Sequence, residues 1–93
     1  MITKVVHIKD GYDVYIGRPS IFGNPFIIGK HGSRYEVISK YKKYFYDLIE
    51  TNEDFKNQIF SLKGKKLGCY CSPQKCHGDV IVEFLESKDD EIS

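Results

Sequence analysis

Residues 65–79 read K-K-L-G-C-Y-C-S-P-Q-K-C-H-G-D, and the fold can be predicted by working outward from them. The short run at 65–71 predicts a β-strand in which alternate side chains share a face. Pro73 interrupts regular structure, so we predict a tight loop at 72–75. Apolar residues then recur at helical spacing, which predicts a helix from residue 76 or 77 to about residue 86. A strand that leads through a tight loop into a helix is typical of α/β folds.

Two further strands are predicted near the N-terminus. Residues 3–8 and 12–16 are short runs rich in β-branched and aromatic residues, and a turn separates them. They can pair as a hairpin, or the second strand can cross to another position in the sheet. The segment 17–32 is rich in glycine and proline, which predicts a long irregular loop. We expect its apolar side chains to pack into the core: Ile21, Phe22, Phe26, Ile27 and Ile28.

Two helices are predicted between this loop and the strand at 65–71. Ser33 and Glu36 form the S-x-x-E pattern of a capping box, and apolar residues at helical spacing continue to about residue 51. Asn52 can cap a second, shorter helix that runs through residue 62.

The order of these elements, β-β-loop-α-α-β-α, predicts the α/β class. We expect a small single-domain sandwich, in which helices pack on a short sheet of three or more strands and a Rossmann-like βα unit forms the site. A chain of 93 residues has room for one core, so we expect one domain over 1–88 and a disordered tail at 89–93.

Composition narrows the classes of function. The formal net charge is +1, which argues against a broad basic face for duplex DNA. The three cysteines all lie between residues 69 and 76, which is not the pattern of a disulfide framework. No apolar run is long enough for a membrane span, so we expect a cytoplasmic protein without a membrane partner.

The stretch after the strand at 65–71 holds the residues best suited to chemistry. Loop and first-turn N–H groups converge at the start of a helix, which favours an anion site. Cys71 and Cys76 are candidate nucleophiles, because a helix N-terminus lowers the pKa of a thiol. His77 and Asp79 are a candidate acid–base pair, and Gly78 would let a ligand approach the backbone.

A metal site is the alternative for the same stretch. Four residues have the right ligand types for zinc: Cys69, Cys71, Cys76 and His77. Structural zinc sites usually place their cysteines two to four residues apart, as C-x₂₋₄-C, and the spacing here differs from that pattern. We therefore expect no cofactor and keep zinc as the alternative.

A second polar cluster lies in the loop that follows the strand at 12–16. Arg18, Ser20, Gly23 and Asn24 are candidate ligand-binding residues, since a guanidinium can hold a phosphate and an amide can read a base. If the strands are parallel, both clusters lie at one edge of the sheet. Four more residues are candidates for the rim of such a site: Tyr15, Phe22, Lys30 and Arg34.

The two clusters also carry a resemblance. The patterns Y-I-G-R-P-S-x-x-G-N-P-F and L-G-C-Y-C-x-P-x-x-C-H-G-D resemble a family of small bacterial and phage proteins, domain of unknown function family 4326. The resemblance extends from about Val5 to Leu85. It implies a phage or mobile-element origin and carries no settled activity.

These observations predict a pocket for a small anionic, nucleotide-like ligand, a nucleotide or a component of nucleic acid, which the protein binds and can transfer or hydrolyse. Two other functions stay open. One is a zinc-stabilised binding module without catalysis. The other is a phage interaction protein that binds a host protein and inhibits a host enzyme or defence system.

Overall fold

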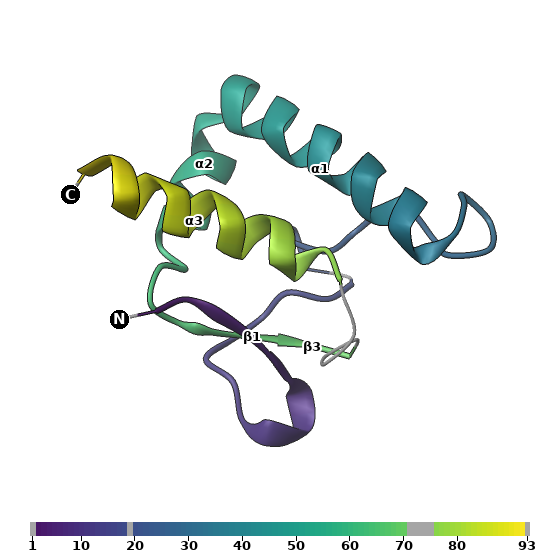
Figure 1. The fold of residues 1–93 in the computed structure, drawn as a ribbon, viewed down its shortest axis with the longest axis horizontal. Coiled ribbons are helices and arrows are strands. Elements are labelled where there is room, and N and C mark those ends of the chain that lie inside the picture. Colours follow the sequence, from purple (N-terminus) through teal and green to yellow (C-terminus); the bar gives the residue numbers. More distant parts are fainter. Residues whose placement is uncertain (1, 19, 71–75, 93) are drawn as a thin grey trace.

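A computed structural model of the chain describes residues 2–18, 20–70 and 76–92, with the side chains up to residue 87. The described elements follow one another as β1 (Lys4–His7), the short 3₁₀ helix η1 (Ile8–Asp10), β2 (Val14–Tyr15), α1 (Arg34–Thr51), α2 (Glu53–Phe60), β3 (Lys66–Cys69) and α3 (Gly78–Ile92). All three helices lie above the sheet in Figure 1. The predicted α/β class is therefore confirmed.

The sheet is parallel, with the strand order β1-β3-β2. Val5 is paired with Leu67 on one side of β3, and Val14 is paired with the same Leu67 on the other side. The first two strands therefore do not form a hairpin: β2 crosses over and pairs with β3. Because the strands are parallel, the segments that follow β2 and β3 start from the same edge of the sheet.

The second strand is shorter than predicted, and the alternation along residues 12–16, which predicts that Tyr12, Val14 and Ile16 share a face, holds only in part. Ile16 is fully buried, whereas Tyr12 is 46% exposed. A Cβ on Gly68 would lie 2.6 Å from the Tyr12 ring, so this ring covers Gly68. Gly68 follows Leu67, a core residue, and therefore points to the other face of the sheet. Tyr12 packs on that outer face, and the prediction that it shares a face with Ile16 was wrong.

The core lies between the sheet and the helices and is rich in aromatic rings. Phe45 of α1 is fully buried and has its ring against those of Tyr41, Phe55 and Phe84. The helical spacing predicted these inward positions correctly. The apolar residues of the segment 52–62 predict that Phe55, Ile59 and Phe60 face inward. Phe55 and Ile59 are buried, whereas Phe60 is 37% exposed.

The predicted helix starts agree with the structure better than the predicted helix ends do. The Ser33 hydroxyl accepts from the N–H of Glu36, and the Glu36 carboxylate accepts from the N–H of Ser33, so the capping box is present. Hydrogen bonds from the backbone and the side chain of Ser33 to the Glu36 carboxylate lower the pKa of Glu36. The Asn52 side chain caps α2 by accepting from the Phe55 N–H. This helix ends at Phe60 rather than at residue 62.

Helix α3 begins at Gly78 and runs to Ile92, whereas the apolar spacing predicted an end near residue 86. The division into a domain at 1–88 and a disordered tail at 89–93 stays a prediction. No helix within the described parts of the chain is long and apolar enough to cross a membrane.

The loop at 17–32 only partly follows the expectation that its apolar residues enter the core. Phe22 is buried, but Ile21, Ile27 and Ile28 are 52%, 40% and 49% exposed. The loop is attached to α1 at its centre, where the buried Tyr41 hydroxyl donates to the carbonyl of Phe22 at 2.9 Å. Three of the five apolar residues expected in the core therefore lie at the surface: Ile21, Ile27 and Ile28.

Candidate functional site

A cavity of about 500 Å³ lies at the edge where β2 and β3 end. One wall comes from the segment after β2 and from the start of α1, and includes Gly17, Arg18, Asn24 and Arg34. We call it the loop wall. The other wall comes from the end of β3 and the start of α3. We call it the junction wall, and its members are Cys69, Tyr70, Cys76 and His77.

The two polar clusters predicted from the sequence therefore share one cavity, but not with all their members. Arg18 and Asn24 line it from the loop wall, and Cys76 and His77 from the junction wall. Four of the predicted residues are not among the described lining residues: Ser20, Gly23, Gly78 and Asp79. Cys71 lies outside the described residues.

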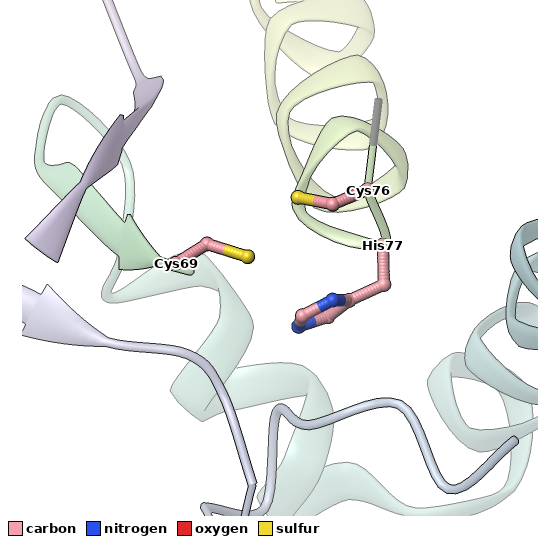
Figure 2. Close-up of side chains that lie close together, drawn as sticks. All are labelled: Cys69, Cys76 and His77. Atoms are coloured by element: carbon pink, nitrogen blue, oxygen red, sulfur yellow. The ribbon is translucent and has the colours of Figure 1, made fainter. Parts of the chain in front are cut away.

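The centre of the junction wall is a compact cluster of Cys69, Cys76 and His77. Figure 2 shows Cys69 at the end of its strand, and Cys76 and His77 at the start of the helix, with the side chains gathered in one place. Their potential ligand atoms all lie within 4.8 Å of one another, and all three residues are buried. Such a cluster could hold a metal ion.

His77 is held firmly within the core. Its Nε2 lies 2.8 Å from the carbonyl oxygen of Ile16, and its ring makes a T-shaped contact with Tyr41 at 5.1 Å between centroids. A carbonyl oxygen can only accept, so Nε2 carries the proton and Nδ1 is left with a lone pair. The structure therefore fixes both the orientation of the imidazole and its tautomer.

Cys76 differs from the activated thiol expected at a helix start. A hydrogen bond with the Cys69 thiol and burial raise the pKa of the Cys76 thiol, although the Gly78 N–H donates to its sulfur at 3.3 Å. The prediction of a lowered pKa was wrong, because two buried thiols in contact oppose ionisation more strongly than one backbone N–H favours it. Its role as a nucleophile stays a prediction.

Asp79 belongs to the start of α3. Its carboxylate accepts from the N–H of Cys76 at 3.1 Å. The Gly78 N–H donates to the Cys76 sulfur. Together these two bonds resemble a capping box in which sulfur replaces oxygen. From the sequence alone, Asp79 can favour the helix start, orient His77 or bind a ligand hydroxyl. The bond to the backbone agrees with the first alternative, and its role in an acid–base pair stays a prediction.

Gly78 is required for close packing between α3 and the sheet. A Cβ at this position would lie 2.7 Å from Cδ1 of Ile16 and 2.8 Å from Cγ2 of Val5. The absence of a side chain thus lets the helix start approach both outer strands. The sequence suggested that Gly78 would let a ligand approach the backbone. The structure gives a different reason for the glycine, which is close packing against Ile16 and Val5.

The loop wall is held by short local contacts. A Cβ on Gly23 would lie 3.0 Å from the backbone nitrogen of Arg18, so glycine lets the loop fold back on itself. Asn24 donates to the carbonyl of Val37 in α1 at 3.2 Å and accepts from the N–H of Phe26 at 2.9 Å. The Ser20 hydroxyl is buried and has no hydrogen-bond partner among the described residues. The two hydrogen bonds of Asn24 therefore attach the loop to α1 and fix its turn.

The rim of the cavity is cationic and aromatic. Tyr15 and Arg34 line it as expected, whereas Phe22 belongs to the core and Lys30 is not among the described lining residues. The sequence reasoning missed Tyr70, whose ring lies 6.1 Å from that of Tyr15 in a T-shaped contact. It also missed apolar lining residues: Phe26, Ile27, Ile28, Val37 and Ile38. Tyr70 could have been found, since it directly follows β3 at this edge.

Fold and site together define a small parallel α/β domain with a cavity at the carboxyl edge of its sheet. Residues 3–87 match the family described as "Domain of unknown function (DUF4326)", and the chain belongs to this family. The resemblance inferred from the two motifs is thus confirmed.

Two viral proteins are similar to the chain over most of its length. One is the "Uncharacterized 12.4 kDa protein in nrdA-td intergenic region" of Enterobacteria phage T4, 40% identical over 93 residues that cover 96% of this chain and 84% of the phage protein. The other is "Uncharacterized protein R718" of Acanthamoeba polyphaga mimivirus, 35% identical over 97 residues that cover 85% of this chain and 71% of the viral protein. No solved structure has significant similarity to the chain.

Proposed function

We propose that the cavity binds a small anionic, nucleotide-like ligand. The observation that carries this proposal is the charge at the cavity: Arg18 and Arg34 line it, and none of its described lining residues is an aspartate or a glutamate. A guanidinium group can bind a phosphate through two parallel hydrogen bonds, and Arg18 is exposed at the surface. An anion is therefore the ligand charge that these walls favour.

The remaining lining residues suit a base or a similar flat ring. Tyr15, Phe26 and Tyr70 supply aromatic surface, and Ile27 and Ile28 add exposed aliphatic surface beside them. Aromatic side chains bind bases by stacking without requiring a particular sequence. A mostly apolar pocket with a few polar groups is also the usual form of a small-molecule site. A phosphate on the arginines and a base on the aromatic side chains would use both kinds of surface.

Transfer or hydrolysis of this ligand would involve the junction wall. In the metal-free protein, His77 is the described residue of that wall best suited to acid–base work, and it would act through Nδ1, because Nε2 is bonded to the Ile16 carbonyl. Assaying candidate nucleotides for turnover with the wild type and with His77→Gln separates a binding protein from an enzyme. Equal and negligible turnover by both proteins would contradict the catalytic part of the proposal.

Thermal unfolding in the presence of mono-, di- and cyclic nucleotides and short oligonucleotides tests the binding proposal. We expect at least one of these ligands to raise the melting temperature, since a ligand that binds only the folded state stabilises it. Arg18→Ala should remove the shift. Lys30→Ala is the matched control, because Lys30 is an exposed cation of the same loop that is not among the described lining residues.

No shift with any of these compounds would contradict the proposal. It would instead favour the alternative in which the chain binds and inhibits a host protein, which would suit the viral relatives. A second candidate function, a non-catalytic module stabilised by metal, is favoured by the buried cluster of Cys69, Cys76 and His77. The metal measurements below distinguish it.

A further inference from the structure

We propose that Cys69, Cys76 and His77 bind a divalent transition-metal ion, with zinc as the best fit, and that the fourth coordination position faces the cavity. The first support is proximity. The potential ligand atoms of the three residues all lie within 4.8 Å of one another, although two of these residues are at the start of α3 and the third ends β3. Three metal-binding side chains therefore meet at one point in the core.

The donor set selects the kind of ion. Two thiolates and an imidazole are borderline to soft ligands, which zinc accepts readily and which magnesium and calcium do not. Cys₂His is also an established set of three protein ligands in zinc enzymes that keep the fourth position for water or substrate. The chemistry of these side chains thus points to zinc rather than to an alkaline-earth ion.

The second support is the set of hydrogen bonds behind the ligands. A metal-binding histidine usually donates its other ring N–H to a carbonyl or carboxylate, which fixes the ring and its tautomer. His77 makes this bond with the Ile16 carbonyl at 2.8 Å, so Nδ1 is the nitrogen available to a metal. The Gly78 N–H donates to the Cys76 sulfur at 3.3 Å. A thiolate would gain from such a donor because charge strengthens the bond.

The surroundings of the cluster are rigid, which a metal site requires. Cys69, Cys76 and His77 are all buried, and Tyr41 of α1 packs its ring against the imidazole. Gly78 brings the helix start close to the sheet, since any side chain there would collide with Ile16 and Val5. The positions of Cys76 and His77 are therefore set by the packing of the helix start on Val5 of β1 and on Ile16, and that of Cys69 by the end of β3.

The open position follows from the cavity. All three residues line the same space of about 500 Å³, so one side of the cluster borders solvent-accessible volume. A metal there would lie at the base of the cavity, where it can bind water or a donor atom of a ligand. The metal site itself depends only on the cluster; its open position connects it to the function proposed above.

A disulfide is the competing outcome for the two thiols. Cys69 and Cys76 form no disulfide in this structure, but their sulfur atoms lie within 4.8 Å of each other, so oxidation has to be tested. Oxidation would consume both thiolate ligands and exclude the metal. Measurements under a non-chelating phosphine reductant, with titration of free thiols, distinguish the two states.

The experiment loads the full-length reduced chain with Zn²⁺ and, separately, with Co²⁺ under anaerobic conditions. We expect one equivalent of zinc after desalting, and a Co²⁺ spectrum with thiolate-to-metal charge transfer and the strong visible bands of tetrahedral coordination. X-ray absorption on the zinc form should give sulfur ligands at about 2.3 Å and nitrogen at about 2.0–2.1 Å. This spectroscopy needs no variant, so it tests the proposal even if every substitution unfolds the chain.

Variants identify the ligands. Cys69→Ser, Cys76→Ser and His77→Gln should each weaken zinc binding by more than about 100-fold, since even loss of an outer hydrogen-bond partner costs 10–100-fold. His31→Gln is the imidazole control and should keep one equivalent of zinc. Cys71 is the remaining ligand candidate from the sequence, so Cys71→Ser tests the open position and should also keep one equivalent. Loss of zinc in Cys71→Ser would overturn the open fourth position.

Absence of stoichiometric zinc and of the cobalt spectrum in the reduced wild type would overturn the metal site altogether, as would a Cys69–Cys76 disulfide that resists reduction. Neither result affects the nucleotide titrations, which depend on Arg18. The two proposals therefore fail separately.

Discussion

The two walls of the cavity differ in burial and in what holds them. The centre of the junction wall is part of the core: Cys69, Cys76 and His77 are buried, and the helix start packs directly on Val5 of β1 and on Ile16. Tyr70 of this wall is 66% exposed and belongs to its rim. The loop wall is at the surface, with Arg18 exposed and Ile27 and Ile28 40% and 49% exposed. The comparison suggests that the junction wall determines stability and metal chemistry, whereas the loop wall determines which ligand binds.

The largest loss of stability should come from His77→Ala in the junction wall. The change leaves the Ile16 carbonyl unpaired and opens a cavity beside Tyr41, so we expect a loss of about 3 kcal/mol. Denaturant unfolding measures it. His31→Ala is the control in the loop at 17–32, which supplies the loop wall and where this ring is only half-buried. A loss there as large as that of His77→Ala would contradict the distinction between the walls.

Gly78→Ala should be the next most damaging change. Its Cβ would meet Ile16 and Val5 at 2.7 and 2.8 Å, so the helix start must move or the two side chains must shift, at about 2 kcal/mol. Gly29→Ala is the control, because nothing lies within 4 Å of its Cβ and only its φ of +88° opposes the change. We expect about 1 kcal/mol there. Equal effects in thermal unfolding would mean that packing at Gly78 is not tight.

Tyr41→Phe should affect the loop at 17–32 moderately and leave the junction wall unchanged. The ring contact with His77 is kept, but the Phe22 carbonyl loses its donor in a buried setting, which costs about 1.5 kcal/mol. The loop should loosen, so amide hydrogen exchange should rise around residues 20–24 and stay unchanged in α3. Faster exchange in α3 as well would contradict the view that this hydroxyl serves only the loop.

Arg18→Ala should have the smallest effect on stability and a large effect on ligand binding. Arg18 is exposed, so we expect less than about 0.5 kcal/mol in unfolding. Binding of an anionic nucleotide should weaken by about tenfold or more, which corresponds to one lost charge-assisted hydrogen bond. Calorimetric titration measures the change. A variant that binds as tightly as the wild type would show that Arg18 is not part of the site.

The sequence predicted the helices well because their signals are local. The capping box of Ser33 and Glu36 and the Asn52 cap each involve residues three positions apart, and both are present. It did not predict the strand order, since the pairing of both Val5 and Val14 with Leu67 is long-range. The exposure of Ile27 and Ile28 was also missed, because an apolar residue in a loop can pack in the core or line a cavity.

The sequence predicted which residue types form the site, but it did not predict how they are arranged in space. The usual C-x₂₋₄-C spacing of structural zinc sites argued against zinc. That spacing describes ligands that lie on a single turn of the chain. Here a strand end supplies Cys69 and a helix start supplies Cys76 and His77, and tertiary packing brings them together. The pKa of Cys76 was predicted in the wrong direction for the same reason, because the neighbouring Cys69 thiol that raises it cannot be placed from the sequence.

The central claim is that both walls face one ligand, and backbone amide chemical shifts test it most directly. Titrating a nucleotide that raises the melting temperature into ¹⁵N-labelled protein should shift amides of both walls: Gly17, Arg18 and Phe26 in the loop wall, and Tyr70 and His77 in the junction wall. Amides at the far end of α1, around residues 47–51, should stay unchanged. Shifts confined to one wall, or gathered at a different surface, would contradict the account.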